Sequence, residues 1–193
     1  MLETHHPAAW TASSSQAMHA GWREGLAIVN LRGDAQDPLF VTATTGALGL
    51  ALPLLACSTV ADGVLRIVWA GPDDWFVIAP TGQAGAIAAA LRSALAGLHH
   101  AVTDVSSGYT VLQLAGPSVR EVLAQGCPLD LHPRAFRPGM SAGSHFFKTS
   151  VWLWQTDIAP TFELLVRSSF KGYCWLMIGR CTAECGLVGR RQN

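Results

Sequence analysis

Three cysteines lie close together near the C-terminus, at Cys174, Cys181 and Cys185. A structural zinc site needs four ligands, which are commonly supplied by pairs of cysteines with two residues between them. Here the cysteines are separated by six and then by three residues, and no histidine lies nearby. The spacing therefore argues against a zinc site. Five cysteines in a chain with no export signal are expected to be free thiols.

A second thiol, Cys127, lies shortly before Asp130 and His132. A cysteine acts as a nucleophile only when a base lies within hydrogen-bond reach and the thiol pKa is lowered. Neighbourhood in sequence does not supply that geometry. Pro128 and Pro133 flank the segment and fix its backbone, so we interpret it as a connector that determines the path of the chain.

The remaining motifs are incomplete. The adjacent pairs His5-His6 and His99-His100 lack the i, i+4 spacing of a zinc-binding helix, which favours solvated or capping roles. Gly71 precedes a proline, and Gly82 and Gly85 lie at the start of a predicted helix, where backbone N–H groups can bind an anion. The chain has neither GxGxxG nor GxxxxGK[ST], so nucleotide binding is not expected.

The carboxylates that most resemble functional groups are Asp73, Asp74 and Asp104. Asp73 and Asp74 belong to a Gly-Pro-Asp-Asp segment with the chemistry of a tight turn, and Asp104 precedes a second turn, which its side chain is expected to cap. A self-sufficient enzyme needs a nucleophile, a base, a metal or a cofactor cradle. The sequence predicts none of them, and we expect no catalytic, cofactor-binding or metal-binding residue on this chain.

The composition suggests a surface that is partly covered by other proteins. Only 13% of residues are charged, against about 25% in a typical domain, while 50% are hydrophobic and seven are tryptophan. Large permanent interfaces are apolar and rich in aromatic residues, so a subunit of a larger assembly is expected; the alternative is a monomer with an unusually apolar surface. The net charge is zero without a basic cluster, which argues against nucleic acid as a partner.

Targeting signals are not evident. Residues 1–20 have neither a basic start nor an apolar core, unlike a signal peptide. The most apolar run, residues 46–56, is interrupted by Pro53 and is shorter than the about 20 residues that span a bilayer. A soluble, cytoplasmic protein without a membrane contact is therefore expected.

Hydrophobic periodicity and turn residues predict an alternation of strands and helices. A Pro-Asp-Asp turn joins two apolar runs into one hairpin, and a second hairpin follows in the C-terminal half. Pro117 is suited to a first helical turn, Gly126 to its end, and Ser168 to an N-cap. The expected strands are residues 26–31, 39–43, 64–69, 75–79, 102–105, 109–115, 146–154 and 162–166, and the expected helices are 83–98, 117–126 and 168–178.

The two parts of the chain repeat one pattern: an apolar segment, a Pro-Leu connector, strand, turn, strand and helix. This predicts a pseudo-duplicated α+β fold with a mixed or antiparallel sheet. We expect an N-terminal arm over residues 1–24, a single domain over residues 25–180 with halves 25–98 and 99–180, and a C-terminal tail over residues 181–193.

Several of these segments resemble a known family. Residues 104–109 (DVSSGY), followed by Leu114-Ala115-Gly116-Pro117, resemble the opening of the folate-binding fold of aminomethyltransferases (glycine-cleavage T-proteins). Residues 126–133 (GCPLDLHP), 161–170 (TFELLVRSSF) and 71–75 (GPDDW) are more specific and resemble the gamma subunits of heterotetrameric sarcosine oxidases. The resemblance covers about residues 60–178.

The resemblance implies a small partner of a large alpha, a medium beta and a small zinc-binding delta subunit. Such a complex oxidises the N-methyl group of sarcosine to give glycine, a one-carbon unit as formaldehyde or methylenetetrahydrofolate, and hydrogen peroxide from oxygen. The FAD, FMN, NAD and tetrahydrofolate sites of the family lie on the alpha and beta subunits. The resemblance thus implies a structural role for this chain in assembly.

One departure bears on folate. Aminomethyltransferases carry a functional aspartate in the hairpin after the connector, whereas residues 146–152 (FFKTSVW) contain no carboxylate. Folate binding by this chain is therefore not expected. Two alternatives to a sarcosine oxidase subunit remain: a subunit of a complex that oxidises another N-methylated amine or amino acid, and an independent folate-binding protein.

Overall fold

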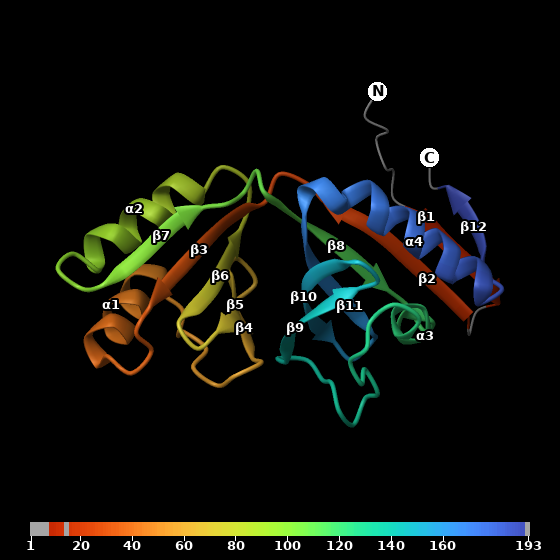
Figure 1. Ribbon diagram of the computed structural model, residues 1–193, viewed down its shortest axis with the longest axis horizontal. Coiled ribbons are helices and arrows are strands. Elements are labelled where there is room, and N and C mark those ends of the chain that lie inside the picture. The colour runs from red at the N-terminus through yellow and green to blue at the C-terminus, as the bar shows by residue number, and fades with distance from the viewer. Residues whose placement is uncertain (1–7, 14–15, 192–193) are drawn as a thin grey trace. The chain divides into compact units, whose positions relative to one another are not determined.

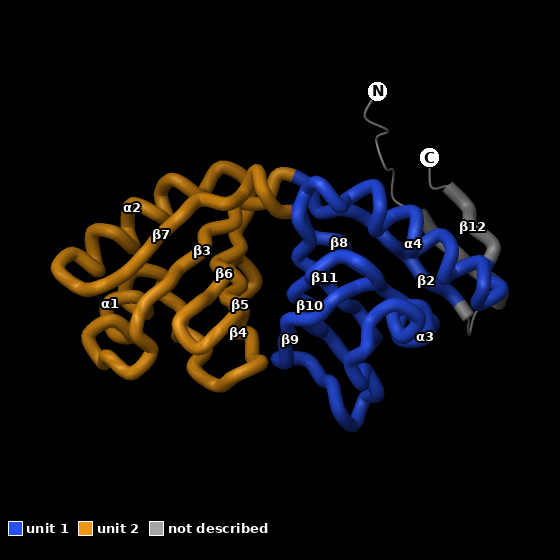
Figure 2. The backbone as a smooth tube through the Cα atoms, viewed as in Figure 1, with its two compact units in different colours: residues 1–24, 110–193 blue, residues 25–109 orange. Residues whose placement is uncertain are grey.

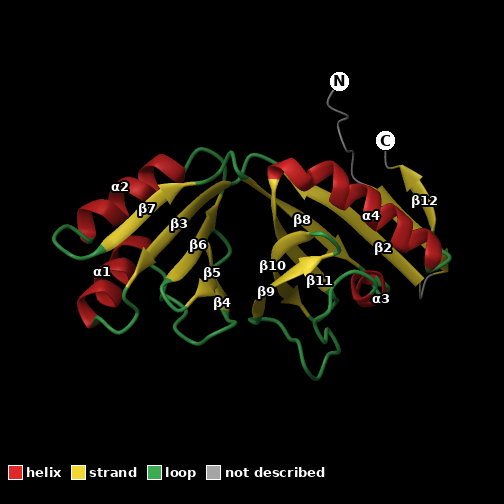
Figure 3. Cartoon of the chain, viewed as in Figure 1, coloured by secondary structure: helices red, strands yellow, loops and turns green. Residues whose placement is uncertain are grey.

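The computed structural model describes residues 8–13 and 16–191, which form two compact units (Figures 1 and 2). One unit is the continuous segment 25–109, and the other combines residues 1–24 with 110–193. Each unit contains one sheet with helices (Figure 3). The expected α+β fold class is confirmed.

The unit of residues 25–109 contains a five-stranded antiparallel sheet in the order β4-β5-β6-β3-β7. The hairpin predicted around the Gly-Pro-Asp-Asp turn is present as β5 and β6. The elements of this unit are β3 (Ala27–Gly33), α1 (Pro38–Leu48), β4 (Thr59–Ala61), β5 (Arg66–Gly71), β6 (Asp74–Ala79), α2 (Ala84–Ala94) and β7 (His100–Asp104).

Helices α1 and α2 share one apolar core with this sheet. Phe40 of α1 and Leu91 of α2 are buried together with Val29 of β3 and Trp75 of β6. Phe40 and Trp75 contact each other with ring centroids 5.9 Å apart. Because both helices contribute to the same cluster, they cover the same face of the sheet, which Figure 1 shows for α2 over β3 and β7.

Residues 39–43, predicted as a strand, belong to helix α1. The run Leu-Phe-Val-Thr-Ala is β-branched and apolar, which favoured a strand. The signals at the two ends of the segment favour a helix instead: the Asp37 carboxylate accepts a hydrogen bond from the Leu39 N–H at 2.9 Å, and Pro38 occupies the first turn. Gly49, with φ of 68°, ends the helix.

The second unit contains a seven-stranded sheet in the order β12-β1-β2-β8-β11-β10-β9. The strands predicted at 109–115 and 162–166 are present as β8 and β11. The strand predicted at 146–154 corresponds to β10, which begins at residue 149, because residue 146 ends β9 and residues 147–148 form the turn between the two strands. The elements of the second unit are β1 (Ala8–Ser13), β2 (Gln16–Arg23), β8 (Tyr109–Ala115), α3 (Val119–Ala124), β9 (Ser141–Phe146), β10 (Thr149–Asp157), β11 (Thr161–Arg167), the 3-10 helix η1 (Ser168–Phe170), α4 (Lys171–Glu184) and β12 (Val188–Arg191).

The two ends of the chain differ from the expected arm and tail. Residues 16–23 form β2, which pairs antiparallel with β8 and buries Met18 and Ala20 in the core, while residues 1–7 and 14–15 lie outside the described residues. At the other end, α4 continues to Glu184 and β12 pairs with β1. The two units meet after residues 24 and 109, whereas the predicted boundaries lie after residues 24, 98 and 180. The N-terminal strands belong to the second unit because β2 pairs with β8, about 90 residues away in sequence, which local patterns do not reveal.

The core of this unit lies between the sheet and helices α3 and α4. Ile178, Cys174 and Cys181 of α4 are buried with Leu112 of β8 and Leu164 of β11. The predicted last helix is confirmed as α4, but Ser168 begins η1 and does not cap α4. Across the described ranges, no helix is long and apolar enough to cross a membrane.

Candidate functional site

The C-terminal cysteines belong to the apolar core. Burial raises the thiol pKa of Cys174 to about 12, and burial followed by the nearby charge of Glu184 raises that of Cys181 to about 11. Cys185 is half-buried, and its sulfur accepts a hydrogen bond from the Gln125 side-chain amide at 3.0 Å. Among residues 8–13 and 16–191 there is no group of three or more His, Cys, Asp or Glu that could hold a metal ion. These thiols are therefore protonated packing groups at neutral pH.

The Cys127 connector does not form a catalytic dyad. Cys127 is buried, and its thiol lies 3.8 Å from the Ser144 hydroxyl as a weak donor. The Asp130 carboxylate accepts from the N–H of His132 at 2.9 Å, and the His132 Nδ1 accepts from the N–H of Arg134 at 3.2 Å. The carboxylate and the imidazole thus stabilise the turns of the connector itself.

The connector of residues 126–133 is also hydrogen-bonded to the turn between β9 and β10, where residues 146–152 contain no carboxylate. The Phe147 N–H donates to the Gly126 carbonyl at 2.8 Å, and the backbone of Phe147 adopts a positive φ of 51°. A Cβ on Gly126 would lie 2.3 Å from the Phe147 ring, so a side chain at that position cannot be accommodated without movement. The glycine at position 126 is therefore explained by close packing between the connector and the β9–β10 turn.

Asp104 caps the turn that follows β7. Its carboxylate accepts from the Ser106 hydroxyl at 2.5 Å and from the Ser106 N–H at 3.0 Å, and these bonds lower its pKa, the hydroxyl contributing most. The Ser106 oxygen in turn accepts from the N–H of Ile28 at 2.9 Å. The DVSSG segment therefore joins the end of β7 to β3, and the capping role predicted for Asp104 is confirmed.

Asp73 and Asp74 connect the β5–β6 turn to β3. Asp73 forms an ion pair with Arg32 at 2.9 Å, and Asp74 accepts from the Asn30 side-chain amide at 2.5 Å. The predicted turn role is confirmed for Asp73, whereas Asp74 is the first residue of β6, and both carboxylates bind polar groups of β3. Gln83, between the glycines at 82 and 85, is the N-cap residue of α2 and makes no side-chain capping bond.

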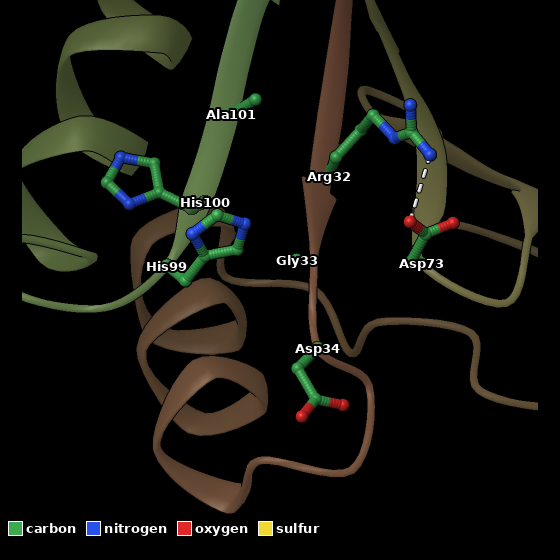
Figure 4. A pocket seen from close by; sticks show the side chains of 7 residues that line it. All are labelled: Arg32, Gly33, Asp34, Asp73, His99, His100 and Ala101. Atoms are coloured by element: carbon green, nitrogen blue, oxygen red, sulfur yellow. Dashed lines mark hydrogen bonds and ion pairs between the residues drawn. The ribbon is translucent and has the colours of Figure 1, made fainter.

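The edge of the sheet beside Asp73 carries a surface pocket of about 440 Å³ (Figure 4). In Figure 4 the His99 ring points into the pocket, whereas the His100 ring points away from it, toward α2. His100 Nδ1 lies 2.9 Å from the Leu98 carbonyl. Because the Arg32 guanidinium is already paired with Asp73, the pocket presents no uncompensated cation to a bound anion. Its lining residues are Arg32, Gly33, Asp34, Asp73, His99, His100 and Ala101.

A buried carboxylate that the sequence did not single out lies on the seven-stranded sheet. Glu163 of β11 is only 2% exposed and accepts from Arg23 Nη1 at 2.7 Å, Gln113 Nε2 at 3.1 Å and Trp154 Nε1 at 2.8 Å. These donors come from β2, β8 and β10, so one carboxylate joins four strands. A signal existed in the sequence: a glutamate inside an otherwise apolar strand requires buried partners. Because donors from three strands occupy its oxygens, Glu163 has a structural role in this sheet.

Over residues 32–184 the sequence matches the family described as "Sarcosine oxidase, gamma subunit family". Two similar proteins are both described as sarcosine oxidase subunit gamma. The one from Corynebacterium sp. (strain P-1) is 36% identical over 135 residues, which cover 68% of this chain and 64% of the relative. The one from Arthrobacter sp. is 38% identical over 116 residues, which cover 59% of this chain and 56% of the relative. The matched region thus spans less than two thirds of either relative.

Two solved structures resemble the fold. A chain of the heterotetrameric sarcosine oxidase from Corynebacterium sp. U-96, in complex with pyrrole 2-carboxylate, has a TM-score of 0.83 at 27% identity, covering 91% of this chain and 88% of that one. The glycine cleavage system aminomethyltransferase T from Bartonella henselae has a TM-score of 0.60 at 15% identity, covering 88% of this chain and 52% of that one. The second likeness concerns the fold alone, and it agrees with the expected aminomethyltransferase-like architecture.

Proposed function

We propose, because this chain belongs to the sarcosine oxidase gamma subunit family, that it is an architectural subunit of a heterotetrameric sarcosine oxidase and carries none of the catalytic residues. One observation supports this role most directly. The candidate groups of the described residues, namely the thiols of α4, Cys127, Asp73, Asp74, Asp104 and Glu163, are each engaged in packing, capping or ion pairs within the fold.

The complex would oxidise the N-methyl group of sarcosine with oxygen. The products are glycine, hydrogen peroxide and a one-carbon unit released as formaldehyde or transferred to tetrahydrofolate. We assign FAD, FMN, NAD and tetrahydrofolate to the alpha and beta subunits and zinc to the delta subunit. The 64% coverage of the Corynebacterium strain P-1 relative and the TM-score of 0.83 support such an assembly.

Folate binding by this chain itself is disfavoured by chemistry. The β9–β10 turn, residues 147–148, and the strand residues next to it carry aromatic, hydroxyl and Lys148 side chains, so no carboxylate is available there to pair with a cationic or N–H-rich pterin edge. We further propose a cytoplasmic location, in line with the five unpaired cysteines.

The test is co-expression of the full chain, tagged, with its neighbouring reading frames. The purified material is scanned for flavin absorbance, its chains are identified by mass spectrometry, and peroxide formation is measured with sarcosine and with a panel of other N-methylated amino acids and amines. The expected result is a yellow complex with companion subunits that produces peroxide and glycine from sarcosine.

Two outcomes would contradict the proposal in different ways. A yellow complex that prefers another N-methylated substrate would retain the architectural role and change the reaction. A colourless, well-folded chain without companions would refute the subunit role. Tight tetrahydrofolate binding by that isolated chain, measured by calorimetry, would then support an independent folate-binding protein.

A further inference from the structure

The outer edge of the five-stranded sheet carries an exposed apolar segment. Strand β4 is the last strand in the sheet order, and it is flanked by the loop of residues 51–58 and the turn of residues 62–65. We call residues 54–64 the β4 edge. Leu54, Leu55 and Val64 are 50%, 77% and 60% exposed, and Cys57 is exposed as well. Leu54 and Leu55 lie before β4 and Val64 lies after it, so the exposed apolar side chains flank the three residues of the strand.

Hydrogen bonds from Trp75 and Ser58 hold the backbone of the loop before β4 in place. Trp75, which is fully buried, donates its indole N–H to the Pro53 carbonyl at 2.9 Å, and the Ser58 hydroxyl donates to the Leu55 carbonyl at 2.6 Å. Cys57 adopts a positive φ of 60°, a conformation that is unfavourable for residues other than glycine. The exposed leucines are therefore fixed by the fold, and their docking would need little further ordering.

The turn after β4 provides the one charge of this segment. Asp62 is the only charged residue between Gly49 and Leu65. Its carboxylate accepts from the N–H groups of Leu65 and Val64, both at 2.8 Å, and these bonds lower its pKa, that from Leu65 contributing most. The β4 edge thus exposes apolar side chains and carries one anion, Asp62, after the end of the strand.

We propose that the β4 edge docks onto a larger subunit of the same assembly, at a surface that is apolar opposite Leu54 and Leu55 and carries a Lys or Arg side chain opposite Asp62. This inference rests on the proposed function. A second copy of this chain is a poorer occupant. A two-fold contact would set residues 54–64 against themselves, and this segment contains no Lys or Arg that could pair with either Asp62 carboxylate.

The free chain contains its own probe for this contact. Cys57 is exposed, whereas Cys127, Cys174 and Cys181 are buried, and burial raises the thiol pKa of the last two. Maleimide labelling of the native full chain, followed by peptide mass spectrometry, is expected to modify Cys57 first. In the purified flavin-bearing complex the labelling of Cys57 should be at least about tenfold slower, because a docked subunit excludes the reagent.

Two labelling results would overturn the inference: equal modification of Cys57 in the free chain and in the complex, or no modification of Cys57 in the free chain. The buried thiols serve as internal references, since their labelling reports unfolding and should be equal in both preparations. This measurement needs no variant, so a folding defect cannot obscure it.

A matched pair of substitutions provides the second test. Leu55→Asp places a charge in the centre of the β4 edge, and Ile158→Asp places the same charge at a 90% exposed position in the β10–β11 turn. Leu55→Asp should weaken retention of the companion subunits by about 30-fold, the effect of losing one interface hot spot. Ile158→Asp should leave retention unchanged, and both variants should match the wild type in circular dichroism and thermal melting.

The outcomes separate this inference from the proposed function. If the wild-type chain retains no flavin-bearing companions, the proposed function and the docking surface both fail. If the wild type and Leu55→Asp retain identical companions equally well, only the docking surface fails. Light scattering that shows a wild-type dimer and a monomeric Leu55→Asp would assign the β4 edge to a second copy and overturn the inference.

Discussion

The buried carboxylate of Glu163 allows a quantitative test of how the seven-stranded sheet is held together. We consider two substitutions, Glu163→Ala and Glu163→Gln. Alanine removes the acceptor of all three donors, Arg23, Gln113 and Trp154. Glutamine keeps the size of the side chain and one acceptor oxygen, but it loses the charge and presents an N–H₂ group to donors on one side.

The expected magnitudes follow from the exposure of each donor. Trp154 is fully buried, so removing the acceptor of its indole N–H costs about 1–3 kcal/mol. The Arg23 side chain is 44% exposed and can turn toward water, so losing the ion pair itself costs about 1 kcal/mol. We therefore expect Glu163→Ala to lower the free energy of unfolding by about 3 kcal/mol, with the cavity included. Glu163→Gln, whose oxygen can still face Trp154, should lower it by about 1–2 kcal/mol.

The assay is urea denaturation of the full chain, followed by tryptophan fluorescence and extrapolated linearly to water. Gln113→Ala is the matched control, because it removes one donor whose side chain is exposed and should cost below about 1 kcal/mol. If Glu163→Ala were no more destabilising than Gln113→Ala, the carboxylate would not be joining the strands, and the reasoning would be refuted.

Three further predictions concern the turns and the connector. Gly126→Ala should destabilise the chain by about 1–3 kcal/mol in urea denaturation because its Cβ would meet the Phe147 ring at 2.3 Å, whereas Gly179→Ala, in an open position of α4, should stabilise it by up to about 1 kcal/mol; equal effects would contradict the packing argument. The hydrogen bonds that lower the Asp104 pKa stabilise the folded state at pH values above 3.8, the ordinary pKa of the group, and this stabilisation is lost as the pH falls through the lower pKa of the folded state. The loss of melting temperature caused by Asp104→Ala should therefore be constant near neutral pH and become smaller in acid. A loss of melting temperature that grows in acid would contradict the sign of this effect. Trp75→Phe should cost about 1–3 kcal/mol and accelerate amide exchange in the loop before β4, and unchanged exchange there would show that the indole does not hold the loop.

Local signals in the sequence predicted much of the fold. The Gly-Pro-Asp-Asp turn and the apolar runs beside it gave the β5–β6 hairpin, and the periodic Ile87, Leu91 and Leu95 gave α2. The prediction of a strand at residues 39–43 was wrong because the β-branched interior of α1 was given more weight than its ends, where Asp37 and Gly49 form the caps. End signals report the backbone hydrogen bonds that a helix must satisfy, which makes them more reliable than composition in a short segment.

Long-range pairing was less predictable. Strand β2 has the alternation of a half-buried strand, with Met18 and Ala20 inward, but nothing in its own sequence specifies β8 as its partner. The hydrogen bonds of Glu163 could not be predicted for the same reason, because their donors, Arg23, Gln113 and Trp154, lie far apart in the chain. The turn role of Asp73 and the capping role of Asp104 were predictable because their partners lie on adjacent strands or in the same turn.

A fold shared with an aminomethyltransferase is not evidence for that enzyme's chemistry, and particular residues of this chain explain how fold and chemistry can separate. The sheets and helices require apolar alternation, caps and a few polar cross-links, and this chain supplies all of them through residues such as Glu163, Ser106 and Gly126. Catalysis would in addition require a charged group left unpaired and aimed at a ligand, which costs stability and must be maintained for function. In the architectural subunit that we propose, such a group is free to be lost. The apolar surface that remains fixed, at the β4 edge, is then the feature that assembly would preserve.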